Sequence, residues 1–194
     1  EQKGVDRTVW LDAWAAAAKA RRMTVRFIYN KSRSGSPSAV EYGLKDVDVL
    51  AAQRPGAVVG FDLVGQESKR TLLEFQPALQ AYREHGGTVP FVFHAGETDA
   101  KGNGTDDNVL DALMLNTSRI GHGYSLAHHP ALRAEVKRRG IALEVCPLSS
   151  QVLGLVGDLR NHPLAQFTSE DVPVVIASDD PGFWGASGLT DDWY

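Results

Sequence analysis

Short apolar segments that alternate with helix-forming segments constrain the fold of this 194-residue chain more than any other feature. Six of them are rich in β-branched and aromatic residues, as strands are. They begin about 20 to 35 residues apart, the size of one strand–helix unit. Several are nearly all apolar, which is typical of parallel strands buried on both faces. The predicted strands cover residues 24–30, 57–62, 89–93, 119–123, 141–146 and 172–178.

Helical patterns fill most of the intervals between these strands. Glycine follows several of them, and proline or aspartate stands near several of their first turns, as in natural helices. Pro77 marks either a kink or a helix start. The polar stretch 31–43 is predicted to be a solvated surface loop, with a lid over a site as the alternative. The predicted helices cover residues 10–22, 71–87, 106–115, 129–140 and 162–169.

Composition narrows the classes of protein to which the chain can belong. It is 43% hydrophobic and 23% charged, which suits a single globular domain. The net charge of −4 gives no basic surface for nucleic acid. No apolar run approaches the ~20 residues of a membrane-spanning helix. The single cysteine, Cys146, cannot form an internal disulfide and is expected to lie buried at a strand end. Nucleic acid and membrane are therefore not predicted partners.

Polar residues gather directly after five of the six predicted strands. The chain reads GQE at 65–67, HAGE at 94–97, GHG at 121–123, CPLSS at 146–150 and SDDP at 178–181. Six consecutive strand–helix units predict either a doubly wound sheet or part of a (β/α)8 barrel. In both folds the C-terminal ends of the strands share one face, and active sites are built there. We therefore expect these five segments to meet.

The side chains in these segments suit metal-assisted hydrolysis. Alone, His94 would be a rim histidine, Glu97 a helix-terminal charge, and one of Asp179 and Asp180 a helix N-cap. His122 lies between two glycines, which permit close approach of the backbone to a ligand. Imidazole and carboxylate together suit Zn²⁺ with a bound water. Two protein ligands are fewer than the three that catalytic zinc usually takes.

Longer motifs around these residues resemble the adenosine deaminases of the amidohydrolase superfamily. These motifs are FHAGETD, LDALMLNTSRIGHGYSLAHHP, LEVCPLSSQVL and ASDDPGFWGASGL. The segments GFDLVGQE and LRNHP resemble in particular the adenosine deaminase-related growth factor branch, which is of extracellular type. The resemblance runs in order from about residue 24 to the end of the chain. It implies an α/β fold of the metal-dependent hydrolase type, an incomplete (β/α)8 barrel.

The resemblance also implies a role for each polar residue. His94 and Asp179 match ligands of a single Zn²⁺, and Glu97 matches the acid that protonates purine N1. His122 matches the histidine that orients or deprotonates the attacking water. Two further residues match substrate contacts, Asp180 at purine N7 and the Gly65 N–H at purine N3.

One part of the family pattern is absent from the chain. The family carries a His-x-His pair at the end of its first barrel strand, and none of the six histidines here forms one. The resemblance therefore implies that residues 1–194 are a partial catalytic barrel with strands three to eight. The first two strands, two further histidine ligands and the last helices would lie outside it, as would an upstream region for a homodimer. The other histidines, 85, 128, 129 and 162, are expected in surface, capping or structural positions.

The function implied by the resemblance is zinc-dependent hydrolytic deamination of adenosine, and of 2′-deoxyadenosine, to the inosine product and ammonia. One alternative is a related deaminase acting on AMP or adenine. A second is a growth-factor-like binding protein that has lost catalysis. The zinc site of cytidine deaminases needs a Pro-Cys-x-x-Cys pair, and the single cysteine excludes it. The fragment alone is expected to have little or no activity.

Overall fold

Six parallel strands form the centre of the computed structural model, which describes residues 7–193. Each overlaps one of the predicted strands, so all six predictions are confirmed. Several are short, because the polar residues at their C-terminal ends leave the ladder to line the site. The strands are β1 Phe27–Ser32, β2 Val58–Val64, β3 Val92–Ala95, β4 Arg119–His122, β5 Ala142–Val145 and β6 Val174–Ile176.

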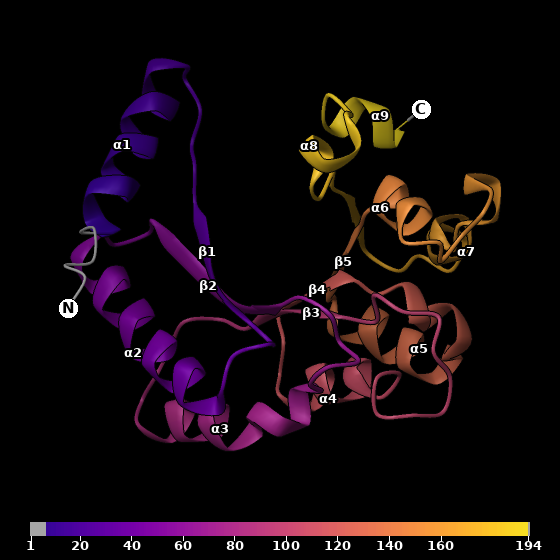
Figure 1. Cartoon of the computed structure of the whole chain (residues 1–194), viewed down its shortest axis with the longest axis horizontal. Coiled ribbons are helices and arrows are strands. Elements are labelled where there is room, and N and C mark those ends of the chain that lie inside the picture. Colours follow the sequence, from indigo (N-terminus) through magenta and orange to yellow (C-terminus); the bar gives the residue numbers. More distant parts are fainter. Residues whose placement is uncertain (1–6, 194) are drawn as a thin grey trace.

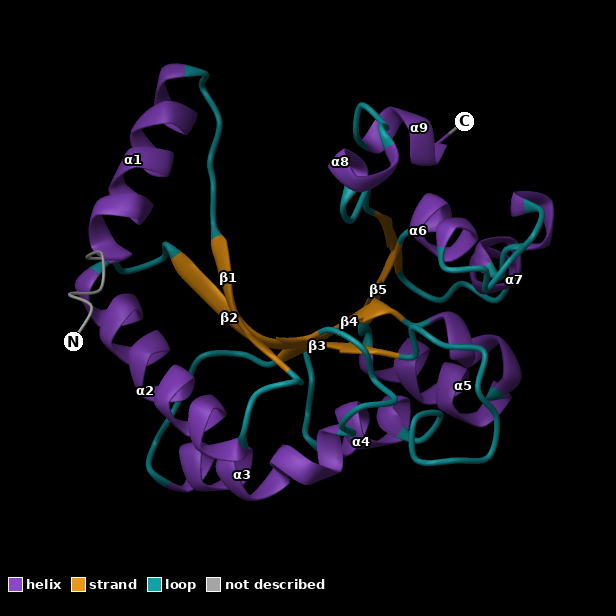
Figure 2. Cartoon of the chain, in the orientation of Figure 1, coloured by secondary structure: helices purple, strands orange, loops and turns teal. Residues whose placement is uncertain are grey.

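The strands follow one another across the structure in chain order. β1 pairs with β2, and β3, β4, β5 and β6 pair successively, always in parallel. A single bridge between Phe61 and Phe91 connects the two sheets. A doubly wound sheet reverses its strand order, whereas a barrel does not. The unreversed order and the curved layer of strands in Figure 2 therefore agree with part of a (β/α)8 barrel.

Most of the helices lie on the outer side of this curved layer (Figure 1). All five predicted helices are confirmed, although the segment 71–87 begins as a short 3-10 helix and Pro77 starts the α-helix after it. None of the helices described is long and apolar enough to cross a membrane. The α-helices are α1 Arg7–Ala20, α2 Pro37–Gln53, α3 Gln76–Glu84, α4 Asn108–Met114, α5 Pro130–Arg139, α6 Pro147–Val152, α7 Leu164–Ser169, α8 Pro181–Trp184 and α9 Leu189–Trp193, and the 3-10 helices are η1 Leu72–Phe75, η2 Tyr124–His128 and η3 Leu159–Asn161.

The prediction of a polar loop or lid over residues 31–43 is wrong. Residues 37–43 are the first turns of α2, a helix that the sequence analysis missed. Ser36 caps it by accepting the N–H of Ala39, and Pro37 occupies its first turn, where proline is favoured. The buried side of α2 repeats with a helical period, at Val40, Leu44 and Val47, and packs into the core. The serines and proline that suggested a loop are the start signal of this helix.

The core lies between the strands and these helices and is rich in phenylalanine. Phe61, Phe91 and Phe93 are almost completely buried, and the rings of Phe91 and Phe93 stack with centroids 5.0 Å apart. Such rings bury a large apolar area and stack in a defined geometry. They hold β2 and β3 in a fixed relation, so the residues that follow these strands are presented on a rigid support.

Candidate active site

All six site residues predicted from the sequence line one cavity of about 660 Å³. It lies at the C-terminal ends of the strands, because His94 is in β3, His122 ends β4, and Gly65 directly follows β2. A cavity of this size is typical of small-molecule sites. The predicted residues that it brings together are Gly65, His94, Glu97, His122, Asp179 and Asp180.

His94 is held by Asp62, a buried carboxylate in β2. One oxygen of Asp62 accepts the His94 backbone N–H at 2.9 Å, and the other contacts ring Nδ1 at 2.7 Å. These two contacts fix the orientation of the ring and leave Nε2 as the nitrogen that can face a ligand. Metal-binding histidines commonly have a carboxylate at their other ring nitrogen in this way. Burial lowers the pKa of His94, but the bond and charge of Asp62, aided by Glu97 and Asp179, outweigh it and raise the pKa to about 9.

His122 lies between two carboxylates at the base of the cavity. Its Nε2 is 3.4 Å from Glu97 Oε1 and 3.9 Å from Asp179 Oδ2, and only 3% of its side chain is exposed. Burial and the nearby His94 lower the pKa of His122 to about 4, so the ring is neutral at pH 7. Burial, with the charges of Asp179 and Glu67, raises the pKa of Glu97 to about 7. The pair therefore places a proton donor beside a proton acceptor.

The backbone at three of these positions adopts the left-handed region. His122 has φ 64° and Asp179 φ 51°, values that cost energy in residues other than glycine. Gly65 has φ 95°, which its lack of a Cβ permits. At His122, the last residue of β4, and at Asp179, shortly after β6, the strained backbone turns the polar side chain toward the cavity. Such strain is found where function requires a particular side-chain position.

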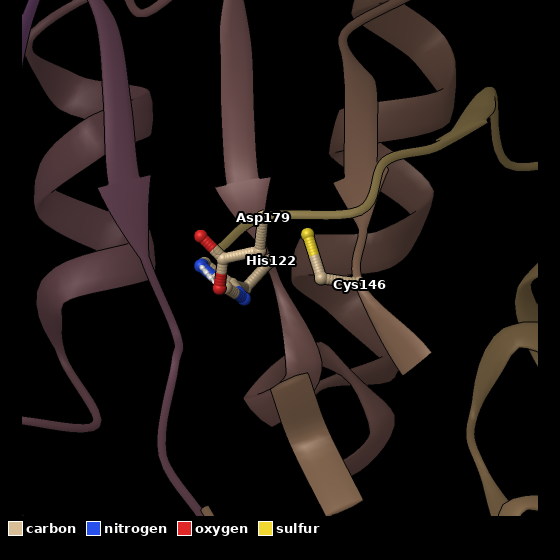
Figure 3. A group of neighbouring side chains, drawn as sticks. All are labelled: His122, Cys146 and Asp179. Atoms are coloured by element: carbon tan, nitrogen blue, oxygen red, sulfur yellow. Dashed lines mark ion pairs between the residues drawn. The ribbon is translucent and has the colours of Figure 1, made fainter. Parts of the chain in front are cut away.

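A metal would find suitable donors on this wall of the cavity. His122, Cys146 and Asp179 place their ligand atoms within 4.8 Å of one another (Figure 3). Cys146 is buried directly after β5, as predicted, and burial with nearby carboxylates raises the pKa of its thiol, which makes it a poor ligand. His94 and Asp179 also line this cavity and offer an imidazole nitrogen and a carboxylate oxygen, donor types that zinc takes, so these two residues could hold the ion.

The other histidines lie outside the cavity lining, as expected. His85 caps α3, and His129 precedes α5 and contacts Asp106 at 2.6 Å. His162 is buried against Ser150, with ring Nε2 3.2 Å from the hydroxyl oxygen. These positions are structural.

The sequence analysis missed the roles of four buried polar residues in and behind the wall of the cavity. They form a connected set of hydrogen bonds around the segment that carries His94 and Glu97. The only sequence signal was a carboxylate inside the apolar segment GFDLV and another at the end of GQE. The missed residues are Arg33, Asp62, Glu67 and Asn108.

Proteins named adenosine deaminase are similar to this chain in sequence. Adenosine deaminase 2 from Homo sapiens is 46% identical over 171 residues, which cover 88% of this chain and 34% of that protein. An adenosine deaminase from Aedes albopictus is 45% identical and is covered to 32%. The chain thus spans about a third of the length of these relatives. Relatives named adenosine deaminase 2 agree with the predicted resemblance to the growth factor branch.

Solved structures of deaminases superpose on the chain. An adenine deaminase from Arthrobacter aurescens aligns with a TM-score of 0.77 and 26% identity, over 94% of this chain and 52% of that one. An amidohydrolase from Burkholderia ambifaria with bound Zn aligns with a TM-score of 0.75 and 25% identity, over 92% of this chain and 47% of its own. The sequence model of the family described as adenosine deaminase matches residues 4–192. The chain therefore belongs to the adenosine deaminase family.

Proposed function

We propose that this chain forms the larger part of the active site of a zinc-dependent enzyme that hydrolyses adenosine and 2′-deoxyadenosine to the inosine product and ammonia. The meeting of Glu97, His122 and Asp179 at the ends of separate strands carries the proposal. It brings an acid, a neutral imidazole and a metal-binding carboxylate within reach of one reacting atom. Membership of the adenosine deaminase family supports the reaction class.

Glu97 acts as the general acid. A carboxyl with a pKa of about 7 is protonated in a large fraction of molecules at neutral pH and can give its proton to a ring nitrogen. Protonation of purine N1 draws electrons from C6, so that a weak nucleophile can attack an aromatic carbon. Glu97 lines the cavity and is 19% exposed at its side chain, so it faces substrate while remaining largely dry.

His122 acts as the general base, because its neutral ring can accept a proton from the attacking water. His94 and Asp179 would hold zinc, with the further ligands supplied by histidines outside these residues. When bound, zinc supplies a nucleophile by lowering the pKa of a water molecule. His122 would orient the attacking water and take its proton, while Asp62 keeps the His94 ring in the orientation that presents Nε2.

The cavity favours a neutral nucleoside over a nucleotide. Asp180 and Gly65 line the cavity; Asp180 would accept a hydrogen bond at the purine edge, and the left-handed backbone at Gly65 would let its N–H approach the ring. No lysine or arginine is among the described lining residues of this cavity. A phosphate would find no cationic partner among them. The alternative of an AMP deaminase is therefore disfavoured.

We expect a zinc-loaded, full-length protein to convert adenosine and 2′-deoxyadenosine, with kcat/KM for AMP lower by about 10²-fold or more, since burying a phosphate without a cationic partner costs several kcal/mol. The change in ultraviolet absorbance on conversion of the aminopurine to its oxo product measures each rate. Adenine and 2′-deoxyadenosine complete the panel. Faster turnover of AMP than of adenosine would contradict the assignment. Absence of turnover in a folded, zinc-loaded protein would favour the binding-protein alternative.

Residues 1–194 alone are expected to bind zinc weakly and to show little or no deamination. His94 and Asp179 are two ligands, and a catalytic zinc takes at least three from the protein. The measurement is zinc content after dialysis against a mild chelator, with circular dichroism as the check that the chain is folded. Stoichiometric zinc retained by these residues alone would show that the set of ligands within them is already complete.

A further inference from the structure

We propose that Glu67 is a positioning residue that fixes the backbone of Gly96 and Glu97 and so places the Glu97 carboxyl in the site. Its two oxygens accept consecutive backbone N–H groups, Glu97 at 2.7 Å and Gly96 at 3.1 Å. Only 3% of the residue is exposed. The inference rests on the proposed function for what the position of Glu97 achieves, but the hydrogen bonds themselves do not depend on it.

Asn108 explains why this position needs a carboxylate. The oxygen of its side chain accepts the N–H of Leu72 at 2.7 Å and a guanidinium N–H of Arg33 at 3.3 Å. The amide of Asn108 must therefore direct its nitrogen to Glu67, where it donates at 2.8 Å. Glu67 is thus surrounded by three N–H donors. Only a group that accepts on both oxygens satisfies all three.

Arg33 supplies the positive charge that lets Glu67 stay buried. Its side chain is fully buried and donates to Asn108, to the backbone oxygen of His94 and to that of Leu63. A buried carboxylate needs such a cation and full hydrogen bonding to offset its lost hydration. The cation also reaches the same segment as Glu67, from its other end at His94.

The turn at Gly96 is held from its other side as well. The Gly96 carbonyl accepts the N–H of Ser125 at 3.0 Å. A Cβ added at Gly96 would lie 2.7 Å from the hydroxyl oxygen of Ser125 and 2.8 Å from Val109. The turn therefore packs tightly on the side of Ser125 and Val109, and the bonds to Glu67 hold its N–H groups. Loss of the hydrogen bonds to Glu67 would release the N–H groups of Gly96 and Glu97, while the contacts of the turn with Ser125 and Val109 would remain.

The position of Glu97 depends on this backbone, because its carboxyl must stay within reach of the reacting atoms. Its contact with His122 is already 3.4 Å, at the edge of hydrogen-bond distance. A displacement of about 1 Å far from the chemistry can cost about 10²-fold in rate. We therefore infer that Glu67 affects kcat only indirectly, by positioning Glu97.

The test compares Glu67→Gln, Glu67→Gln/Asn108→Asp and the matched control Glu84→Gln in the zinc-loaded, full-length protein. In Glu67→Gln, only one atom of the side-chain amide, its oxygen, can accept hydrogen bonds. In the position of Oε2 this oxygen keeps the bonds from the Gly96 N–H and from Asn108, so the Glu97 N–H loses its acceptor. In the double variant, the carboxylate introduced at position 108 can accept from the amide nitrogen at position 67. The amide oxygen at position 67 then turns back to the Glu97 N–H. Glu84 is exposed at the end of α3 and undergoes the same chemical change.

We expect Glu67→Gln to lower kcat by about 10- to 100-fold with KM changed less than about threefold, and the double variant to recover most of kcat. In a Glu97→Gln background the same substitution should change kcat by less than about threefold, because the effect passes through Glu97. Full additivity in that background would assign Glu67 a purely structural role and overturn the proposal. Glu84→Gln should match the unmodified protein.

Hydrogen exchange at the Glu97 amide gives a readout that does not require turnover. Exchange should be faster in Glu67→Gln and slow again in the double variant. Glu67→Asp, which keeps the charge beside Arg33 and shortens the side chain, tests the same bonds if the amide variant fails to fold. Unchanged exchange at the Glu97 amide in a folded variant would refute the role of Glu67 in holding this backbone. Faster exchange in a protein that has no deaminase activity would support that role and refute the proposed function.

Discussion

Glu97→Gln is expected to lower kcat for adenosine deamination by about 10²- to 10⁴-fold, the usual contribution of a positioned general acid. Glutamine has the same shape and can still hydrogen-bond a ring nitrogen, but it cannot release a proton at neutral pH. Burial raises the pKa of the native carboxyl to about 7, which suits it to give up that proton. The measurement is the initial rate of adenosine conversion, followed by ultraviolet absorbance in the zinc-loaded protein.

The matched control is again Glu84→Gln, at an exposed position in α3, which should retain full activity. Zinc content separates a chemical effect from a structural one, because Glu97 is not a proposed ligand and its substitution should leave the metal bound. A Glu97→Gln protein with more than a third of the native kcat would remove Glu97 from the role of proton donor.

Several strands were predictable because they are parallel and buried, so they appear in the sequence as nearly continuous apolar segments. β5, for example, is Ala142–Val145 within the predicted 141–146. Helix α2 was not predicted, since its cap and first turn contain Ser36, Pro37 and Ser38, residues that also mark loops. The apolar residues that repeat with a helical period from Val40 onward were the sequence signal that indicated this helix.

The lining of the site was predictable for a different reason. Residues directly after parallel strands must share one face, so His94, His122 and Asp179 were expected to meet before any distance was known. The residues behind them could not be found in this way. Asn108 is 75 positions from Arg33, and no local pattern records that the two side chains touch. Contacts between residues so distant in sequence are fixed only by the packed fold.

Arg33 ties together the ends of three strands from inside the core. It follows β1, and its guanidinium donates to Leu63 in β2 and His94 in β3, as well as to Asn108 at the start of α4. Burial lowers the pKa of this guanidinium, opposed by the charges of Glu67 and nearby carboxylates. Its loss would leave several carbonyl oxygens without a donor and these carboxylates without their cation.

Arg33→Met is therefore expected to lower the free energy of unfolding by about 3 to 5 kcal/mol, the usual cost of removing one partner from a buried charged pair. Methionine fills much of the space, so the loss reports charge and hydrogen bonds more than a cavity. Arg22→Met, at an exposed position, should change stability by less than about 0.5 kcal/mol. Chemical denaturation monitored by tryptophan fluorescence measures both. Equal stability of the two variants would mean that the buried carboxylates do not need this cation. It would contradict the inference that Arg33 allows Glu67 to stay buried.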